Sequence, residues 1–277
     1  MTLGGIVKTK SEDERFYGTV VDRWRVRNLC FSESVYPPEA RIRRPSHSHP
    51  YFSILLHGSY RETYHGGVRE CSPASAVLHS PGEVHADQFL GAGGRIFRFE
   101  IDDSESDLVL ARGLSGTVEL RNGRVRCLAA RLYCESRNLD RFSPLAAEAL
   151  ALEIISEAKR DGFSRAERGS PRWLLQATEL LHEALPDNLT LTRIANVVGV
   201  HPVHLARVFR RHHGCSVGEY ARNWRVEVAS RQLAAGTAPI VEVAATAGFA
   251  DQSHLCRTFK KVGGLTPTEF RAIFRRR

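Results

Sequence analysis

Residues 191–277 contain the same helical unit twice. His204–Arg225 aligns with His254–Arg275 at a constant offset of 50 residues, without insertion or deletion. The identical pairs include Leu205/Leu255, Arg207/Arg257, Phe209/Phe259, Gly214/Gly264 and Glu219/Glu269. A repeat of this kind means that one structural unit is used twice, so this part of the chain is predicted to fold as two copies of one motif.

Each copy opens with a short apolar helix that a glycine ends. The apolar residues at helical spacing are Leu191, Ile194, Ala195 and Val198 in the first copy and Ile240, Val243, Ala244 and Ala247 in the second. Gly199 and Gly248 follow, and glycine accepts the left-handed backbone of a helix C-terminus. A second helix is predicted to begin at Pro202 in one copy and after Asp251 in the other. This order is the helix-turn-helix pattern.

The second helix of each copy has an apolar stripe and a basic outer face. The stripe consists of Leu205, Val208 and Phe209 in the first copy and of Leu255 and Phe259 in the second. The basic residues off the stripe are Arg207, Arg210 and Arg211 and then Arg257, Lys260 and Lys261. A basic face suits docking in the major groove of DNA. The alternative is an ordinary solvated face, but the match between the two copies favours DNA binding.

The connection between the copies fits the geometry of DNA. Residues 217–235 read as one helix, which Gly236 ends. At ~1.5 Å per residue such a helix spans roughly 28 Å, and successive major grooves on one face of B-DNA lie about 34 Å apart. One chain is therefore expected to place its two recognition helices in adjacent grooves.

These features resemble the DNA-binding domain of the AraC/XylS family of bacterial transcription regulators. The family signature runs from Ile240 to Arg271 and includes Gly248, Phe249 and Pro267. The resemblance implies that the exposed positions of both second helices contact bases: Val203, Ala206 and Arg207, and then Gln252, Ser253, Cys256 and Arg257. The candidate DNA-binding set also contains His204, Arg210, Arg211, Lys260 and Lys261, of which Arg210, Lys260 and Lys261 are expected at phosphates.

Two positions depart from that family pattern. His201 stands where the family usually has a serine N-cap, and Val217 stands where the second copy has Pro267. In addition, Arg207 is the one strong base reader that the first helix offers, since Val203 and Ala206 provide only apolar contacts.

The net charge of +8 is concentrated in the C-terminal part. From Ser170 onward there are 15 Lys and Arg against 8 Asp and Glu, a charge of +7, whereas the rest carries 24 against 23, a charge of +1. A basic C-terminal part is expected for a nucleic-acid footprint, and the nearly neutral N-terminal part need not touch DNA.

Cysteine usage and hydropathy indicate a cytoplasmic protein. The six cysteines include no C-x-x-C pair, which favours buried thiols, although a redox pair of Cys127 and Cys134 is an alternative. No apolar run reaches the ~18 residues of a membrane span. The first residues lack the apolar core of a signal peptide.

The N-terminal part reads as β structure. Short segments with glycine and proline punctuation fill residues 41–102, and in Arg95–Asp102 apolar and polar residues alternate as in a half-buried strand. His47-x-His49 and Pro81-Gly82-x-x-His85 resemble the two histidine motifs of a cupin barrel, the sensor domain of many AraC-type regulators. The fold class is therefore α+β with two domains: a cupin-like β-barrel with trailing helices, and an all-α domain with two helix-turn-helix units.

His47, His49 and His85 are the candidate site of the N-terminal domain. Alternate strand residues point the same way, so His47 and His49 are expected to converge, with His85 approaching from another strand. Three imidazoles suit Zn, Fe or Ni, but Ser53 and Ile54 occupy the positions where metal-binding cupins have a glutamate. We therefore favour a pocket for a small-molecule effector and predict no cofactor. A third interpretation is that these histidines are polar strand residues that bind no ligand.

Two helices and a linker are predicted between the domains. Val125, Leu128, Ala129 and Leu132 indicate one helix, and a stripe of Leu145, Ala149, Leu152 and Ile155 after Pro144 indicates another. The stripe is expected to cover the barrel or to pair with its copy in a homodimer, as the resemblance implies. The predicted domains are 1–160 and 172–277, with a polar linker at 161–171 and a first DNA-domain helix around Trp173–Leu185.

The sequence thus predicts a non-enzymatic transcription regulator, with activation implied by the resemblance. Its expected partners are double-stranded promoter DNA, RNA polymerase, an unknown small-molecule effector and a second copy of the chain. No association with a membrane is expected. One rival is a metal-dependent cupin enzyme with a DNA-binding tail, against which the missing glutamate argues. The other is an architectural DNA binder that responds to no ligand.

Overall fold

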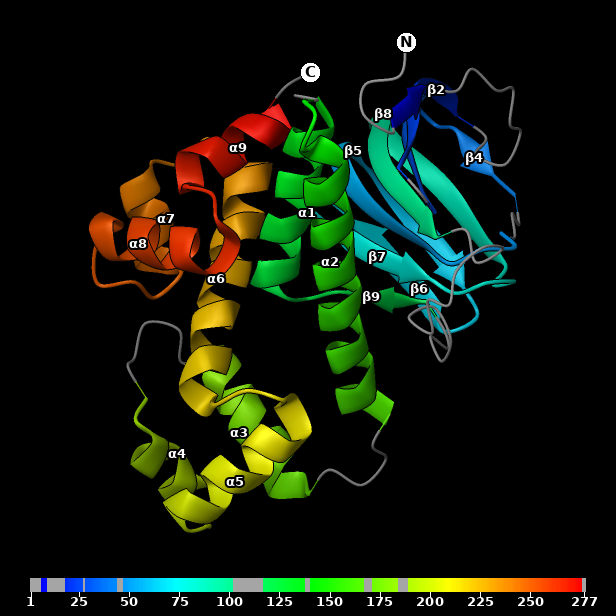
Figure 1. Cartoon of the computed structure of the whole chain (residues 1–277). Helices are drawn as coiled ribbons and strands as arrows, with labels where there is room; N and C mark the ends of the chain where they lie inside the picture. Colours follow the sequence, from blue (N-terminus) through cyan, green and yellow to red (C-terminus); the bar gives the residue numbers. More distant parts are fainter. Residues whose placement is uncertain are drawn as a thin grey trace.

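The computed structural model describes residues 6–8, 18–26, 28–43, 47–101, 117–137, 140–166, 171–183 and 189–275. These residues form an N-terminal β-sheet and a set of helices that begins against the sheet and extends away from it (Figure 1). No helix in the described ranges combines the length and the apolar character needed to cross a bilayer.

The sheet is antiparallel and contains nine described strands. The strands are β1 (Ile6–Lys8), β2 (Thr19–Val26), β3 (Leu29–Tyr36), β4 (Arg41–Ile42), β5 (Tyr51–Tyr64), β6 (Gly67–Cys71), β7 (Ala76–His79), β8 (His85–Ile101) and β9 (Val118–Glu119). Their order is β1-β2-β3-β8-β5-β7-β9, with β4 paired to β8 and β6 paired to β5. The predicted β structure is confirmed, and the closure of the sheet into a barrel stays a prediction.

Gly58 lies inside one long strand, β5, although the glycine and proline punctuation of residues 41–102 predicts short segments. Gly58 has a φ of 84°, and a side chain there would collide with the carbonyl of Gly93 on β8. Glycine is therefore required at this bend, where the register between β5 and β8 shifts.

The prediction that the end of β8 is half-buried is wrong. Phe97, Phe99 and Ile101 are buried as expected, but Arg98 and Glu100 on the opposite face are buried too. The Arg98 guanidinium donates a hydrogen bond of 2.6 Å to the Tyr36 hydroxyl. The polar face of this end of β8 is therefore covered by the fold as well. Buried polar side chains are tolerated on a covered face when they form hydrogen bonds, as Arg98 does.

Two helices follow the sheet: α1 (Gly123–Arg137) and α2 (Ser143–Ala166). The predicted stripe of α1 is buried, but most of the stripe predicted for α2 is not: Leu145 is 67% exposed and Ala149 is exposed as well. The side chains that α2 buries against the core are Ala147, Leu150, Ala151, Ile154, Ile155 and Ala158. The helix also continues into the predicted linker, as far as Ala166.

Seven helices form the described C-terminal part, in the order that the repeat predicts. They are α3 (Arg172–Glu183), α4 (Leu191–Val197), α5 (Pro202–His213), α6 (Val217–Ala235), α7 (Ile240–Thr246), α8 (Gln252–Gly263) and α9 (Pro267–Arg275). The predicted connecting helix, 217–235, coincides with α6. Gly199 and Gly248 have φ values of 71° and 75°, as expected for glycines that end α4 and α7.

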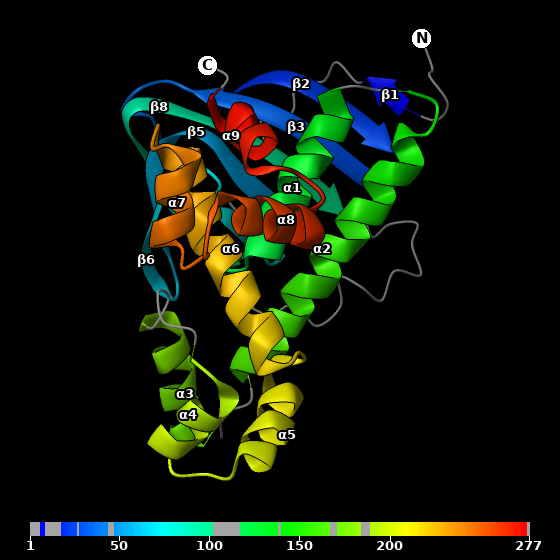
Figure 2. The same cartoon turned by 90° about the vertical axis from the view of Figure 1, so that its left-hand side faces the viewer.

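The two helix-turn-helix units occupy different hydrophobic cores. The helices α3, α4 and α5 form a small core with the start of α6, which lies at the lower end of the molecule in Figure 2. The helices α7, α8 and α9 instead share one core with α1, α2 and the β-sheet. The second unit is thus packed onto the N-terminal part of the chain.

Close helix contacts and a buried ion pair fix this packing. A Cβ on Gly263 of α8 would lie 2.1 Å from the Cβ of Cys127 on α1, so these helices approach as closely as a glycine allows. Arg126 of α1 donates from Nε to Glu227 of α6 at 2.6 Å, and both side chains are at most 1% exposed. Arg126 also donates to the carbonyl oxygen of Ala74. Among the described residues, no disulfide joins the cysteines.

Candidate nucleic-acid interface

The helices α5 and α8, which the sequence predicts as recognition helices, have matched ends. His201 accepts a hydrogen bond from the Val203 amide through Nδ1 at 3.3 Å, so histidine fills the N-cap role at this position. Asp251 caps α8 by accepting from the His254 amide at 2.6 Å. Both helices end at a glycine in the left-handed conformation, at Gly214 and Gly264. The two helices therefore begin and end at equivalent positions of the repeat.

Capping boxes hold the helices that follow α5 and α8. Ser216 and Glu219 exchange hydrogen bonds at the start of α6, and Thr266 and Glu269 do the same at the start of α9. These bonds hold the pKa of both glutamates below the usual value. The sequence contains the signal for both capping boxes, a Ser or Thr followed three residues later by Glu, so these helix starts could have been predicted from it.

The predicted base-contacting residues lie on accessible faces of the two helices. Val203 is 69% exposed, and Arg207, Gln252, Ser253 and Arg257 are exposed. Ala206 and Cys256 are half-buried. The guanidinium of Arg207 lies 3.4 Å from Nδ1 of His204, one turn earlier on α5. The apolar stripes of both helices face inward, as predicted, with Leu205, Phe209, Leu255 and Phe259 fully buried.

The basic residues at the C-terminal ends of α5 and α8 divide into two groups. Arg211 and Lys260 are exposed. Arg210 and Lys261 are also exposed, but they line a cleft of about 700 Å³ between the two helix-turn-helix units and α2. Glu157 of α2 and Arg222 of α6 line the same cleft. Arg210 and Lys261 therefore lie beside α2 in this arrangement.

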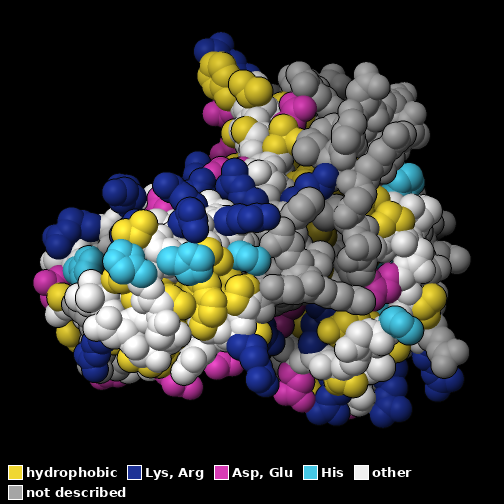
Figure 3. Space-filling view, turned by 90° about the horizontal axis from the view of Figure 1, so that it is seen from below, with side chains coloured by type: hydrophobic (Ala, Val, Ile, Leu, Met, Phe, Trp, Pro, Cys, Tyr) yellow, Lys and Arg dark blue, Asp and Glu magenta, His cyan; other side chains and the backbone are white. Residues whose placement is uncertain are grey.

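Positive charge gathers at the end of the molecule that carries α3, α4 and α5. Figure 3 views this end and shows a row of Lys and Arg side chains beside a row of histidines. In α5, the last turn alone contains Arg210, Arg211, His212 and His213. A basic surface of this kind attracts the phosphates of DNA.

The N-terminal histidines converge only in part. His47 and His85 are buried, and their ring centroids lie 5.7 Å apart. The expectation that His47 and His49 share a strand is wrong, because residues 47–50 precede β5, and His49 is half-buried. His79 belongs to neither histidine motif of the sequence, yet its ring centroid lies 5.1 Å from that of His85.

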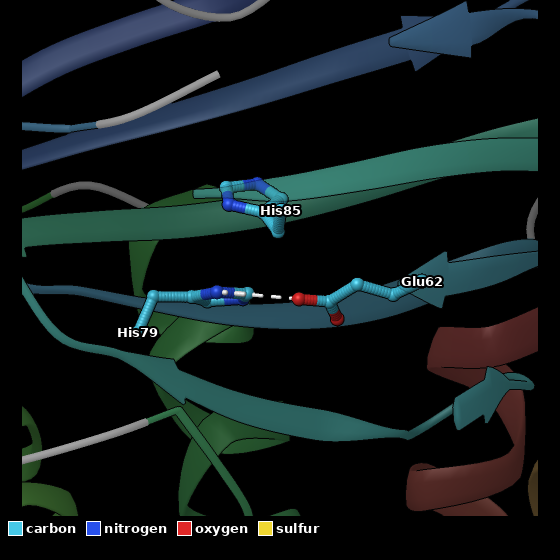
Figure 4. Close-up of side chains that lie close together, drawn as sticks. All are labelled: Glu62, His79 and His85. Atoms are coloured by element: carbon cyan, nitrogen blue, oxygen red, sulfur yellow. Dashed lines mark ion pairs between the residues drawn. The ribbon is translucent and has the colours of Figure 1, made fainter. Parts of the chain in front are cut away.

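An acidic residue also reaches this group. Glu62 of β5 is fully buried, and its carboxylate lies 3.6 Å from Nδ1 of His79 (Figure 4). The same carboxylate lies 3.1 Å from Nε of Arg69. Burial raises the pKa of Glu62 to about 8 and of Asp87 to about 7, and it lowers the pKa of His85 to about 4 and that of His79 as well. Glu62 lies well beyond Ser53 and Ile54, where metal-binding cupins have their glutamate. No short sequence motif therefore indicates that Glu62 lies near the histidines.

Comparisons with known proteins agree with the geometry of the helical part. A helix-turn-helix domain family matches residues 194–273. The transcription factor PqrA of Proteus vulgaris is 35% identical over 85 residues, which cover 31% of this chain and 70% of PqrA. An AraC-like transcription regulator of Streptomyces antibioticus is 31% identical over 137 residues.

The chain belongs to the AraC family of helix-turn-helix transcription regulators. The match to the Streptomyces regulator covers 47% of this chain and 45% of that protein. The arabinose operon regulatory protein of Escherichia coli (strain K12) is 34% identical over 98 residues, which cover 35% of this chain and 34% of that protein. The chain thus spans about half the length, or less, of these two relatives.

A likeness in structure extends over most of the chain but is weak. Apo ToxT of Vibrio cholerae aligns with 89% of this chain and 98% of its own, at 12% identity and a TM-score of 0.41. That similarity is too low to support an inference about function. The family assignment therefore rests on the helical part, and the N-terminal domain has to be interpreted from its own residues.

Proposed function

We propose that this AraC-family chain is a sequence-specific transcription regulator that reads DNA with both recognition helices. The observation that carries the proposal is the matched pair of exposed faces on α5 and α8, joined by the 19-residue helix α6. Arg207, Gln252 and Arg257 supply base recognition. The phosphate contacts are made by the exposed basic residues at the C-terminal ends of the two helices: Arg210, Arg211, Lys260 and Lys261.

The N-terminal domain is proposed to bind a small-molecule effector and the chain to activate transcription through RNA polymerase. The buried polar residues around His47 and His85 support an effector site, because they offer several hydrogen-bonding groups to a small molecule. Activation is inherited from the family resemblance. The exposed residues Leu145 and Ala149 at the start of α2 support a homodimer.

The enzyme alternative is supported less well. The AraC relative AdaA of Bacillus subtilis (strain 168) is named a bifunctional transcriptional activator and DNA repair enzyme. For this chain we infer regulation without catalysis, because Arg207 and Arg257, the equivalent exposed residues of the two units, are suited to binding DNA. Turnover of a substrate by the purified chain would contradict this inference.

Replacing Arg257 with alanine tests base reading directly. If Arg257 makes a bidentate contact with a guanine, Arg257→Ala is expected to cost ~1–3 kcal/mol of binding free energy at the specific site and little on random DNA. Affinities for both kinds of DNA are measured by fluorescence anisotropy at several salt concentrations. An equal loss on both would make Arg257 a phosphate contact and remove it from the base-reading set.

Lys260→Ala is the matched control on the same helix. As a phosphate contact, Lys260 is expected to contribute about equally to specific and random DNA, and its loss makes the salt slope of binding shallower by about one. Together the two variants separate the base-reading face of α8 from its phosphate-binding end.

A further inference from the structure

Two imidazoles and one carboxylate meet inside the N-terminal sheet. Glu62 comes from β5, His79 from the end of β7 and His85 from the start of β8, and all three are buried. One donor atom from each residue lies within 4.8 Å of the other two. We propose that Glu62, His79 and His85 form a binding site for a divalent transition-metal ion of the zinc class.

The spacing of the donor atoms is close to that of an occupied site. Zinc binds histidine nitrogen and carboxylate oxygen at about 2.0–2.2 Å, so neighbouring ligand atoms in a tetrahedral site lie roughly 3.4 Å apart. Nδ1 of His79 and Oε1 of Glu62 are already 3.6 Å apart. All donor atoms lie within 4.8 Å of one another, so no pair has to approach by more than about 1.4 Å, which is within the range of side-chain adjustment.

Donor atoms of His79 and Glu62 face each other without a hydrogen bond. Among the described residues, Nδ1 of His79 and Oε1 of Glu62 have no hydrogen-bond partner. Figure 4 shows His79 pointing at the Glu62 carboxylate, with His85 next to the pair. Leaving buried polar atoms without a partner costs free energy, and a bound cation would satisfy these atoms together.

Neighbouring side chains orient the proposed ligands. The Ser53 hydroxyl lies 3.5 Å from Nε2 of His79, and the ring of Tyr51 stacks on the same imidazole with centroids 4.2 Å apart. The Tyr51 hydroxyl lies 3.2 Å from Nε2 of His85. Metal-ligating histidines usually have their second nitrogen held by a hydrogen-bonding group, and Ser53 and Tyr51 are placed for that role.

Two further charged side chains, Arg69 and Asp87, lie beside the proposed ligands. Arg69 pairs with Oε2 of Glu62 and leaves Oε1 facing His79, so the ion pair with Arg69 does not use both carboxylate oxygens. Asp87, which is also buried, lies 3.9 Å from Nε2 of His85. A ligating carboxylate is normally bonded to a further group, so Arg69 can orient Glu62 without displacing the ion.

Ligand chemistry selects the class of metal. Two imidazole nitrogens and one carboxylate oxygen suit Zn²⁺ and its first-row neighbours, whereas Ca²⁺ and Mg²⁺ prefer oxygen ligands alone. Three protein ligands leave a fourth position for water or a small ligand. The proposed site differs from the one that the sequence motifs suggested, since Glu62 and His79 replace His47 and His49 as ligands.

Metal binding is tested with the full-length chain. The chelator-treated protein is titrated with Zn²⁺ by calorimetry and, separately, with Co²⁺ followed by visible absorption. We expect one Zn²⁺ per chain and the d–d absorption of tetrahedral Co²⁺. His79→Gln and Glu62→Gln are each expected to weaken Zn²⁺ binding at least about 100-fold. His65→Gln, at an exposed histidine in the turn after β5, is the matched control and should bind as the wild type does.

Three outcomes overturn the proposal: no stoichiometric Zn²⁺ uptake by the wild type, uptake that His79→Gln leaves unchanged, or a Co²⁺ complex without d–d bands of tetrahedral type. Circular dichroism shows whether each variant folds, and if His79→Gln does not, the wild-type titration and Co²⁺ spectrum still decide. No DNA is present in these experiments, so their result is independent of the proposed regulatory function.

Discussion

Replacing Glu227 with glutamine is expected to lower the free energy of unfolding by about 3–5 kcal/mol. Glu227 is fully buried and accepts hydrogen bonds from Arg126 at 2.6 Å and from Arg231 at 2.8 Å. The substitution keeps the volume of the side chain but leaves the buried guanidinium of Arg126 without its counter-charge. A buried charge that loses its partner is far more costly than a lost surface pair.

Urea unfolding followed by far-UV circular dichroism measures this effect. Glu242→Gln, at an exposed position on α7, is the matched control, and its effect is expected to stay within about 0.5 kcal/mol. A loss below about 1 kcal/mol for Glu227→Gln would mean that water or another group compensates Arg126. It would also show that the α1–α6 contact is weaker than its geometry indicates.

Truncating the equivalent phenylalanines of the two units is expected to destabilise different parts of the chain. Phe209 and Phe259 occupy the same position of the repeat and are both fully buried. Phe209→Ala and Phe259→Ala should each cost about 3–5 kcal/mol. However, Phe209 belongs to the small core of α3, α4 and α5, whereas Phe259 belongs to the core shared with α1 and the sheet.

Hydrogen exchange followed by mass spectrometry distinguishes the two effects, because it reports local opening. Phe209→Ala is expected to speed exchange in α3–α5 and to leave β5 and β8 protected. Phe259→Ala is expected to speed exchange in α7–α9 and also in α1. Equal acceleration of the sheet by both variants would show that the two cores unfold as one.

The helical part was largely predictable because its signals are local and occur twice. Gly199, Pro202 and Asp251 mark helix ends by backbone conformation and capping, which depend on few neighbours. The connecting helix coincides with the predicted 217–235, since an uninterrupted apolar spacing between a cap and a glycine leaves few alternatives. Because the two copies align without insertion or deletion, a helix end that is evident in one copy also predicts the equivalent helix end in the other.

The N-terminal domain was less predictable because its packing is not local. Arg98 and Glu100 read as a solvent-exposed face, but the fold covers them. Leu145 and Ala149 of α2 lie at helical spacing, yet the buried face is that of Ala147, Leu150 and their neighbours. Glu62 and His79 meet only through the pairing of β5 with β7 and β8, and no short motif encodes that pairing.

The shared core has a consequence for regulation. A ligand in the N-terminal domain can alter DNA binding only if it binds one arrangement of the chain more tightly than another. The second helix-turn-helix unit packs on α1, and Arg126 of α1 donates to the carbonyl oxygen of Ala74 in the turn between β6 and β7. We therefore expect any effector to act mainly on the position of α5 relative to α8.

Selection of DNA from a random pool by the full-length chain, followed by sequencing, shows whether both helix-turn-helix units read bases. The full chain is needed because α7, α8 and α9 share their core with the N-terminal part. Two recognition helices on one face of DNA predict two short conserved blocks about one helical turn apart. A single conserved block, or no enrichment at all, would contradict the claim that both units read bases.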